Sequence, residues 1–119
     1  MTTSEIAQRL VDLNKKGEEG YKQIYAELYS PDIVSVENWG DREEHVGMDA
    51  LMAKGQKWEE SVEEMFEMRV GEPLVADKSF AVTFYMDVKL KGMDRMQMTE
   101  LAVYRVNDEG KIYHEEFTA

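Results

Sequence analysis

The fold is decided by residues 80–90, which read FAVTFYMDVKL. Apolar side chains occupy every second position of this stretch, namely Phe80, Val82, Phe84, Met86, Val88 and Leu90. A period of two is typical of a β-strand with one buried face. Two further alternating stretches, Met96 to Val106 and Lys111 to Phe117, each follow a turn that contains Gly and Asp. The end of the chain therefore predicts three consecutive antiparallel strands.

The register of these strands predicts two acids on an apolar face. If each hairpin closes directly around its turn, Glu100 opposes Met86 and Glu115 opposes Ala102. Both carboxyls then share a face with Phe84. Their backbone positions are diagonal neighbours, about 7–8 Å apart, so both side chains could reach one ligand. Because buried carboxyls are costly, this placement indicates a site.

The composition of the chain argues against several classes of function. The chain has 119 residues, a net charge of −11 and no cysteine. This length fits a single domain, residues 1–119. The negative charge argues against nucleic acid and anionic membranes, because both attract clusters of Lys and Arg. Without Cys, and with two histidines far apart in sequence, we expect no metal site and no cofactor.

The N-terminal segment predicts a helix start, not a targeting signal. Thr2 and Glu5 match a capping box, and Ile6, Leu10 and Leu13 then form an apolar helical stripe. This start lacks the basic residues and the apolar core of a signal peptide. No apolar run reaches the length of about 20 residues that spans a bilayer. We therefore expect a cytoplasmic protein.

The middle of the chain predicts two further helices and two further strands. A second helix over residues 21–29 ends before Pro31, and a strand over 33–39 carries Val34, Val36 and Asn38 on one face. Residues 40–47 are polar and predict a loop. An apolar stripe from 48 to 66 predicts a long helix, and a strand follows near 66–70. Helices that precede a mostly antiparallel sheet indicate an α+β fold, with the helices packed on a strongly curved sheet around a conical pocket.

Several segments of this order resemble a known family. They are residues 28–34, reading LYSPDIV, residues 45–51, reading HVGMDAL, and residues 103–112, reading VYRVNDEGKI. With them, nearly the whole chain resembles the SnoaL-like branch of the nuclear-transport-factor-2-like superfamily. The resemblance implies a cystatin-like α+β cone. The superfamily includes ketosteroid isomerases, polyketide cyclases, dehydratases and members without catalysis, most of them dimers or larger, so the fold alone does not give the function.

At the positions where this resemblance places the catalytic residues of the ketosteroid isomerases, this sequence has other residue types. The carboxylate base falls on Asn38, which cannot accept a proton at neutral pH, unless the strand is shifted so that Glu37 faces inward. The protonated aspartate falls on Ala102, and the tyrosine donor falls near Leu10. We therefore expect no ketosteroid isomerase activity.

Two hypotheses of function remain open. In the first, the protein binds a small apolar or carbonyl-bearing molecule without catalysis. In the second, it is a cofactor-independent lyase, isomerase or cyclase, and Glu100 and Glu115 are its acid/base pair. The predicted ligand-binding residues are Asn38, Trp39, Phe84, Met86, Ala102, Tyr104, Tyr113 and Phe117. Each acid has a structural alternative, either at the rim in water or bonded to Asn38, Tyr104 or Tyr113.

The outer face of the sheet predicts self-association. Leu101 and Val103 lie there among Thr99 and Arg105, a mixture too apolar for a face that meets only water. A homodimer through this face would cover it. We expect no nucleic-acid or membrane partner.

Overall fold

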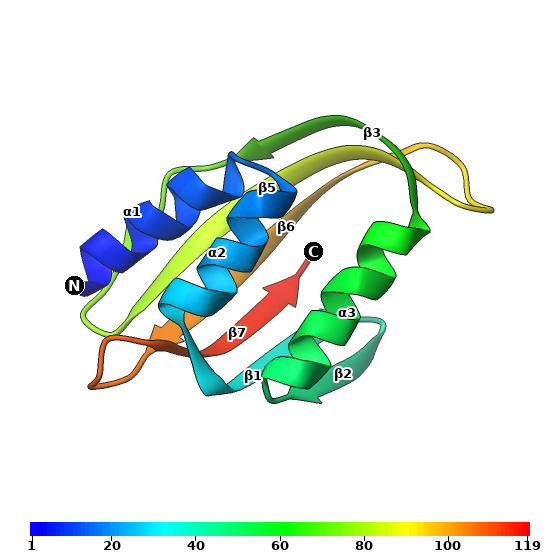
Figure 1. Ribbon diagram of the computed structural model, residues 1–119. Coiled ribbons are helices and arrows are strands. Elements are labelled where there is room, and N and C mark those ends of the chain that lie inside the picture. Colours follow the sequence, from blue (N-terminus) through cyan, green and yellow to red (C-terminus); the bar gives the residue numbers. More distant parts are fainter.

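The computed structural model has three helices packed against one curved sheet (Figure 1). It describes the whole backbone of residues 1–119 and every side chain except those of Glu18 and Trp39. The helices are α1 (Thr3–Asn14), α2 (Glu18–Leu28) and α3 (Met48–Ser61). The strands are β1 (Tyr29–Trp39), β2 (Asp41–Val46), β3 (Val62–Val70), β4 (Leu74–Val75), β5 (Ser79–Leu90), β6 (Met96–Val106) and β7 (Ile112–Thr118).

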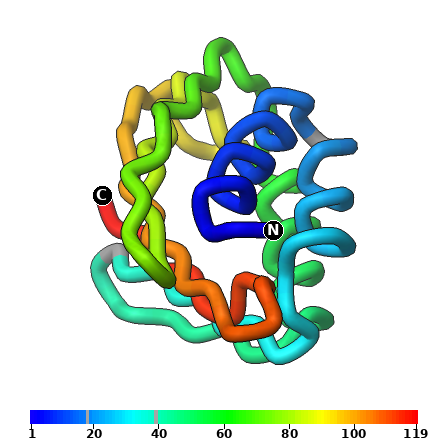
Figure 2. Tube along the Cα trace, turned by 90° about the vertical axis from the view of Figure 1, so that its left-hand side faces the viewer, coloured from blue at the N-terminus to red at the C-terminus, as the bar shows by residue number. Residues whose placement is uncertain are grey.

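The sheet has the strand order β2-β1-β7-β6-β5-β3, and the short β4 pairs with β5 outside this path. Only β1 and β7 run parallel among the pairs of described strands, so the sheet is mostly antiparallel. Viewed end-on, the sheet curls around one side and the helices close the other (Figure 2). This arrangement confirms the predicted α+β fold.

The N-terminal helix forms for the reasons that its sequence gives. Thr2 Oγ accepts a hydrogen bond from the Glu5 backbone at 3.1 Å, and Glu5 Oε1 accepts one from the Thr2 backbone at 2.8 Å. The stripe of Ile6, Leu10 and Leu13 is fully buried in the core. The predicted capping box and stripe are thus confirmed, and α1 covers one end of the sheet.

Three element boundaries differ from the prediction. Residues 40–47 are not a loop, because Gly40 makes a tight turn with φ 61° and Asp41–Val46 pairs with β1 as an edge strand. Polar side chains are usual on such an edge, so polarity alone was misleading. The predicted long helix ends at Ser61, since pairing with β5 draws residues 62–70 into the sheet. Tyr29 begins β1 rather than ending α2.

The predicted strand registers are wrong by two residues. Glu100 opposes Phe84, not Met86, and Ala102 opposes Phe117, not Glu115. Both turns are longer than predicted. A shift of two keeps every side chain on its face, so the two acids do face the concave side. They are no longer diagonal neighbours, however, because Glu115 opposes Tyr104.

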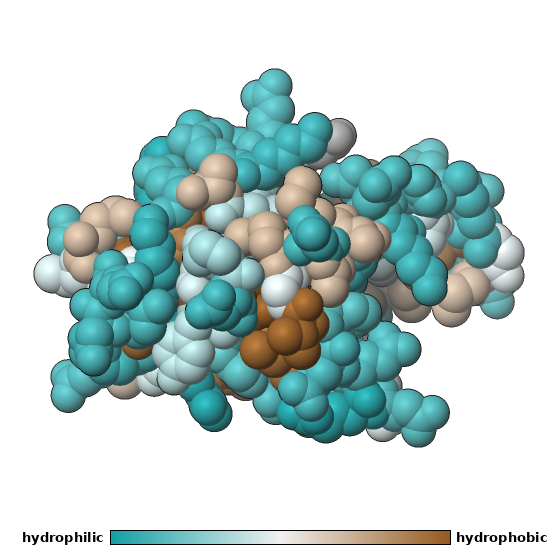
Figure 3. All heavy atoms as spheres, turned by 60° about the horizontal axis from the view of Figure 1, so that its bottom comes forward, coloured by the Kyte–Doolittle hydropathy of each residue, from teal (hydrophilic) through white to brown (hydrophobic). Residues whose placement is uncertain are grey.

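The outer surface is mixed in character. On the outer sheet face Leu101 is 38% exposed, while Val103 is half-buried. The view from below the molecule shows a mainly hydrophilic surface with a small hydrophobic group near its centre (Figure 3). A homodimer through the outer sheet face stays a prediction. None of the described helices has both the length and the apolar character needed to cross a membrane.

Replacing Gly20 by Ala is expected to destabilise the protein. A Cβ at this position would lie 1.8 Å from the backbone oxygen of Leu13, so α1 and α2 would have to separate. Such overpacking costs about 1–3 kcal/mol. Gly55→Ala is the matched control, because its Cβ would meet nothing nearer than the Tyr25 hydroxyl at 3.4 Å, and helix propensity favours Ala there by up to about 1 kcal/mol. Urea unfolding of both variants measures the difference, and equal stabilities would contradict the close helix packing.

Candidate functional site

A cavity of about 780 Å³ lies between the helices and the concave face of the sheet. The apolar part of its wall is mostly aromatic and sulfur-containing, with contributions from Tyr21, Tyr25, Trp58, Met68, Phe84, Met86, Tyr104 and Phe117. Its polar lining includes Glu37, Lys54, Glu100 and Glu115. An apolar cavity with a few converging polar groups is the usual form of a small-molecule site.

The structure places some of the predicted site residues on the wall of the cavity and others away from it. Those that line the cavity are Glu100, Glu115, Phe84, Met86, Tyr104 and Phe117. Ala102 is fully buried in the core and is not among the lining residues. Asn38 and Tyr113 are exposed and do not line it either. Trp39 lies outside the described side chains. The binding and catalytic roles of these residues stay predictions.

Two of these placements have a clear backbone cause. Tyr113 points outward because an irregularity between Arg105 and Val106 changes the register of β7, so that Ile112 is buried and Tyr113 is 40% exposed. On β1, successive side chains alternate between the two faces. Glu37 faces the cavity, so its neighbour Asn38 cannot. The predicted loss of a carboxylate at this point of β1 is therefore wrong, since Glu37 supplies one.

Glu115 is the most deeply buried acid of the site, at 2% exposure. The Tyr29 hydroxyl donates a hydrogen bond to its Oε1, and Ser35 Oγ donates one to its Oε2 at 2.7 Å. Burial raises the pKa of Glu115, whereas Lys54 and the two hydroxyl donors act to lower it. Burial and the adjacent carboxylate raise the pKa of Tyr29, so the phenol keeps its proton and acts as the donor.

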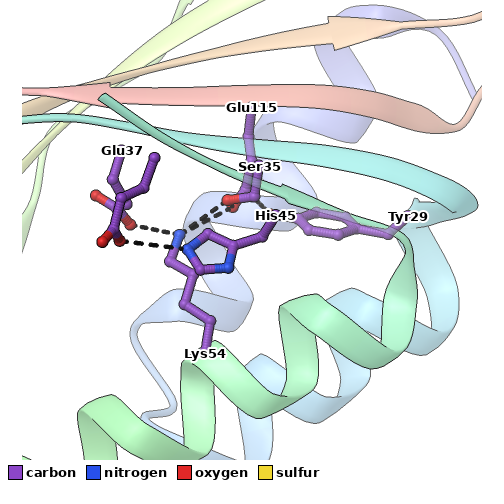
Figure 4. Close-up of polar contacts among 7 residues, drawn as sticks. Tyr29, Ser35, Glu37, His45, Lys54 and Glu115 are labelled. Atoms are coloured by element: carbon purple, nitrogen blue, oxygen red, sulfur yellow. Dashed lines mark hydrogen bonds and ion pairs between the residues drawn. The ribbon is translucent and has the colours of Figure 1, made fainter. Parts of the chain in front are cut away.

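The side chain of Lys54 extends from α3 toward Ser35, Glu37 and Glu115 of the sheet (Figure 4). We call this group of polar residues the floor of the cavity. Its Nζ donates to Ser35 Oγ at 2.8 Å, forms an ion pair with Glu37, and lies 4.0 Å from Glu115 Oε2. The same ammonium lies 4.7 Å from the centre of the Phe117 ring. One cation is thus shared by two carboxyl groups. On β2, which also lines the cavity, His45 lies 3.7 Å from Glu43.

Glu100 differs from the other two acids. Among the described residues, its carboxyl makes no hydrogen bond or ion pair, although it faces the same cavity. Burial raises the pKa of Glu100 to about 7, with Glu37 and Glu115 adding to the rise and Lys54 opposing it. An acid with such a pKa can either accept or donate a proton at neutral pH.

Several residues of this site were missed by sequence reasoning. Lys54 lies three residues after Leu51 and four before Trp58, so its spacing already placed it on the inner stripe of α3. A charged side chain on a helix is usually solvent-facing, so the charge of Lys54 argued against that placement. Ser35 and Glu37 were missed because the inward face of β1 was taken to be that of Asn38. No spacing in the sequence connects Tyr29 to Glu115, since β1 and β7 meet only in the fold.

The described residues form no group of three or more His, Asp or Glu side chains arranged to hold a metal ion. The polar groups instead pair with one another or face the apolar cavity. Fold and site together define a class of protein: an α+β cone with a mostly apolar cavity between its helices and its sheet.

Comparisons with known proteins identify the family within this class. The SnoaL-like domain matches residues 1–118. A crystal structure from Mesorhizobium loti, with the provisional name SnoaL-like polyketide cyclase [carbohydrate phosphatase], is 33% identical, covers 100% of both chains and has a TM-score of 0.90. This chain belongs to the SnoaL-like family. No match to this chain is found among curated proteins.

More distant structures show the same fold. A SnoaL-like polyketide cyclase, again provisionally named, from Jannaschia sp. CCS1 is 15% identical, with a TM-score of 0.78 over 98% of this chain and 85% of the other. A cystatin-like protein of unknown function from Xanthomonas campestris is 20% identical, with a TM-score of 0.76 over 98% of this chain and 89% of the other. At these identities the likeness concerns the fold alone.

Proposed function

We propose that this protein binds a small, largely apolar molecule in the cavity and that the Glu100 carboxyl is its polar contact. The observation that carries this proposal is the Glu100 carboxyl on an apolar wall, where no described side chain forms a hydrogen bond or ion pair with it. Because burying a polar group without a partner is costly, a ligand that contacts Glu100 gains a favourable interaction there. Phe84 opposes Glu100 on the next strand and provides apolar contact beside it.

A second candidate function is proton transfer without a cofactor, as in an isomerase, lyase or cyclase. It is favoured by the pKa of Glu100, which burial raises to about 7. Glu115 is a weaker candidate partner than predicted, because Tyr29 and Ser35 already occupy its oxygens. The provisional polyketide cyclase name of the Mesorhizobium loti relative is consistent with this class. In such a reaction Glu100 removes a proton from a carbon beside a carbonyl group and returns it elsewhere.

Exchange of deuterium into a model ketone tests the second candidate. If the second candidate holds, the protein accelerates exchange at the carbons beside the carbonyl of 4-phenyl-2-butanone in D₂O, and Glu100→Gln removes about 10²-fold of that acceleration. NMR signals of the ketone report exchange, and amide shifts of β5 and β6 report binding. Glu116→Gln is the matched control, because Glu116 pairs with Val103 on the opposite face of the sheet.

The outcomes separate the two candidates. Exchange at the buffer rate, with shifts at the cavity strands, would remove the catalytic candidate and leave binding. Equal exchange by the wild type and Glu100→Gln would show that Glu100 is not the proton-transfer group. An absence of shifts at the cavity would count against ketones as ligands.

A further inference from the structure

We propose that the ligand of this cavity is an organic ammonium ion, with its cationic nitrogen beside Glu100 and its apolar part among the aromatic and methionine side chains. This inference rests on the proposed function, namely that the cavity binds a small molecule at Glu100. It names the chemical class of that molecule. Three observations on the cavity carry it: the balance of charge, the nature of the wall, and the hydrogen-bonding capacity of Glu100.

The charge balance in the cavity is uneven. The carboxyl groups of Glu37, Glu100 and Glu115 line the cavity together with Lys54, and Lys54 is the cation that acts on the pKa of both Glu100 and Glu115. Lys54 contacts Glu37 and Ser35 and lies 4.0 Å from Glu115, so it is committed to the β1 and β7 side of the site. The third carboxyl, on β6, has no cation of its own among the described residues. A cation brought by the ligand would complete the pairing of charges.

The wall near Glu100 is suited to a cation with an apolar body. Phe84 opposes Glu100 across the β5–β6 pair, and Tyr21 reaches over the same region, with its hydroxyl 3.8 Å from Met68 Sδ. Aromatic faces attract cations through their ring quadrupole. The cavity already shows such a contact, because the Lys54 ammonium lies over the Phe117 ring. Rings and methionines would also cover the alkyl or aryl part of the ligand.

The hydrogen-bonding capacity of Glu100 distinguishes the ligand classes. Above its pKa of about 7 Glu100 is mostly ionised, and an ionised carboxylate only accepts hydrogen bonds, so in that state it matches an ammonium ion and not a carbonyl oxygen. An anionic ligand would meet three carboxyl groups in the cavity. The net charge of −11 acts in the same direction, since it attracts cations toward the protein and repels anions.

The other charged groups around the cavity enter the test because it uses pH. These are Glu43, His45, Lys22, Lys57 and Glu59, with Glu43 and His45 near one another on β2. Tyr21, Tyr25 and Tyr104 also line the cavity, and burial raises the pKa of each, so they stay neutral below pH 9. Burial raises the pKa of Glu100 to about 7. Glu115 lines the same cavity and burial raises its pKa as well, so the Glu100→Gln and His45→Gln variants are needed to assign a change in cation binding near this pH to Glu100.

Calorimetric titration with three probes of shared shape tests the inference. The probes are benzyltrimethylammonium, 4-phenyl-2-butanone and 3-phenylpropionate, which carry a positive, zero and negative charge. The charge of the first does not depend on pH, so any pH effect on its binding belongs to the protein. We expect this cation to bind most tightly, with an affinity that rises about 10-fold between pH 5.5 and 8.5 as Glu100 ionises.

Variants assign the effect to Glu100. In Glu100→Gln we expect the cation to bind at least about 10-fold more weakly at pH 8.5, with little dependence on pH. Glu59→Gln and His45→Gln, which also alter charged lining residues, should keep the pH dependence of the wild type. Circular dichroism confirms that each variant is folded, and Glu37→Gln gives a second reading, with weaker cation binding expected.

Each other result overturns a defined part of the proposal. Tighter binding of the ketone than of the cation, with amide shifts on β5 and β6, would reject the ammonium class and leave the proposed function intact. Equal cation binding by the wild type and Glu100→Gln would reject Glu100 as the contact. Failure of all three probes to bind, in folded protein, would count against both the inference and the proposed function.

Discussion

Glu100→Gln is expected to be more stable than the wild type at pH 8 and nearly as stable as the wild type at pH 5. Burial, with the charges of Glu37 and Glu115, raises the pKa of Glu100 from 4.5 to about 7 in the folded state. Between these two values the folded protein binds more protons than the unfolded chain does. The free energy of unfolding therefore falls as pH rises through this window, and Gln, which does not titrate, removes this loss.

The size of the effect follows from the same shift. Each pKa unit corresponds to 1.36 kcal/mol. We expect the stability difference between Glu100→Gln and the wild type to grow by about 2–3 kcal/mol from pH 5 to pH 8. Other acids also titrate over this range, and burial raises the pKa of Glu115 as well. The difference between the two proteins at each pH cancels the contributions of acids that do not interact with Glu100, whereas those of Glu37 and Glu115 are included in the expected range.

Urea unfolding at several pH values between 5 and 8 measures this effect. Glu116→Gln serves as the matched control, because Glu116 lies on the outer face of the neighbouring strand and should show no such trend. A stability difference that stays constant with pH would mean that Glu100 titrates normally, and the unpaired carboxyl at the centre of the proposed site would be lost. A lower stability of Glu100→Gln at every pH would mean that the carboxyl has a stabilising protein partner.

The C-terminal strands were predictable because their information is local. Alternation over residues 80–90 and 96–106 places Glu100 and Phe84 on the same face, whichever of two registers the turn selects. The exact register was not predictable in this way, since it depends on turn lengths that the sequence leaves open. The separation of Glu100 from Glu115 depended on that register and was therefore wrong.

The β1 side of the site was not predictable because its partners are distant. Glu115 receives hydrogen bonds from Tyr29 and Ser35, which lie 86 and 80 residues away in sequence. These contacts require the parallel pairing of β1 with β7, and no local pattern encodes that pairing. A register shift between Tyr29 and Val34 further changes which residues of β1 face inward. A one-residue error on a strand reverses the face, which is why Asn38 was expected where Glu37 lies.

Glu115→Ala is expected to lower the free energy of unfolding by about 3 kcal/mol. The truncation removes the acceptor of two buried donors, the Tyr29 hydroxyl and Ser35 Oγ, and leaves a void at a position that is 2% exposed. An unpaired buried donor costs about 1–3 kcal/mol. Relief of repulsion with Glu37 and Glu100 opposes this loss, since Lys54 remains paired with Glu37. Two orphaned donors and a void outweigh that relief.

Chemical denaturation at pH 7 measures the loss, and two further variants define its cause. Glu116→Ala, one residue away on the opposite face, should change stability by no more than about 0.5 kcal/mol. Glu115→Gln keeps the volume and one acceptor oxygen, so it should recover most of the stability. If Glu115→Ala were as stable as the wild type, the hydrogen bonds of Tyr29 and Ser35 would have no net structural value. Glu115 would then be a buried acid that contributes nothing to folding, and a role in function would be the remaining reason for its place in the cavity.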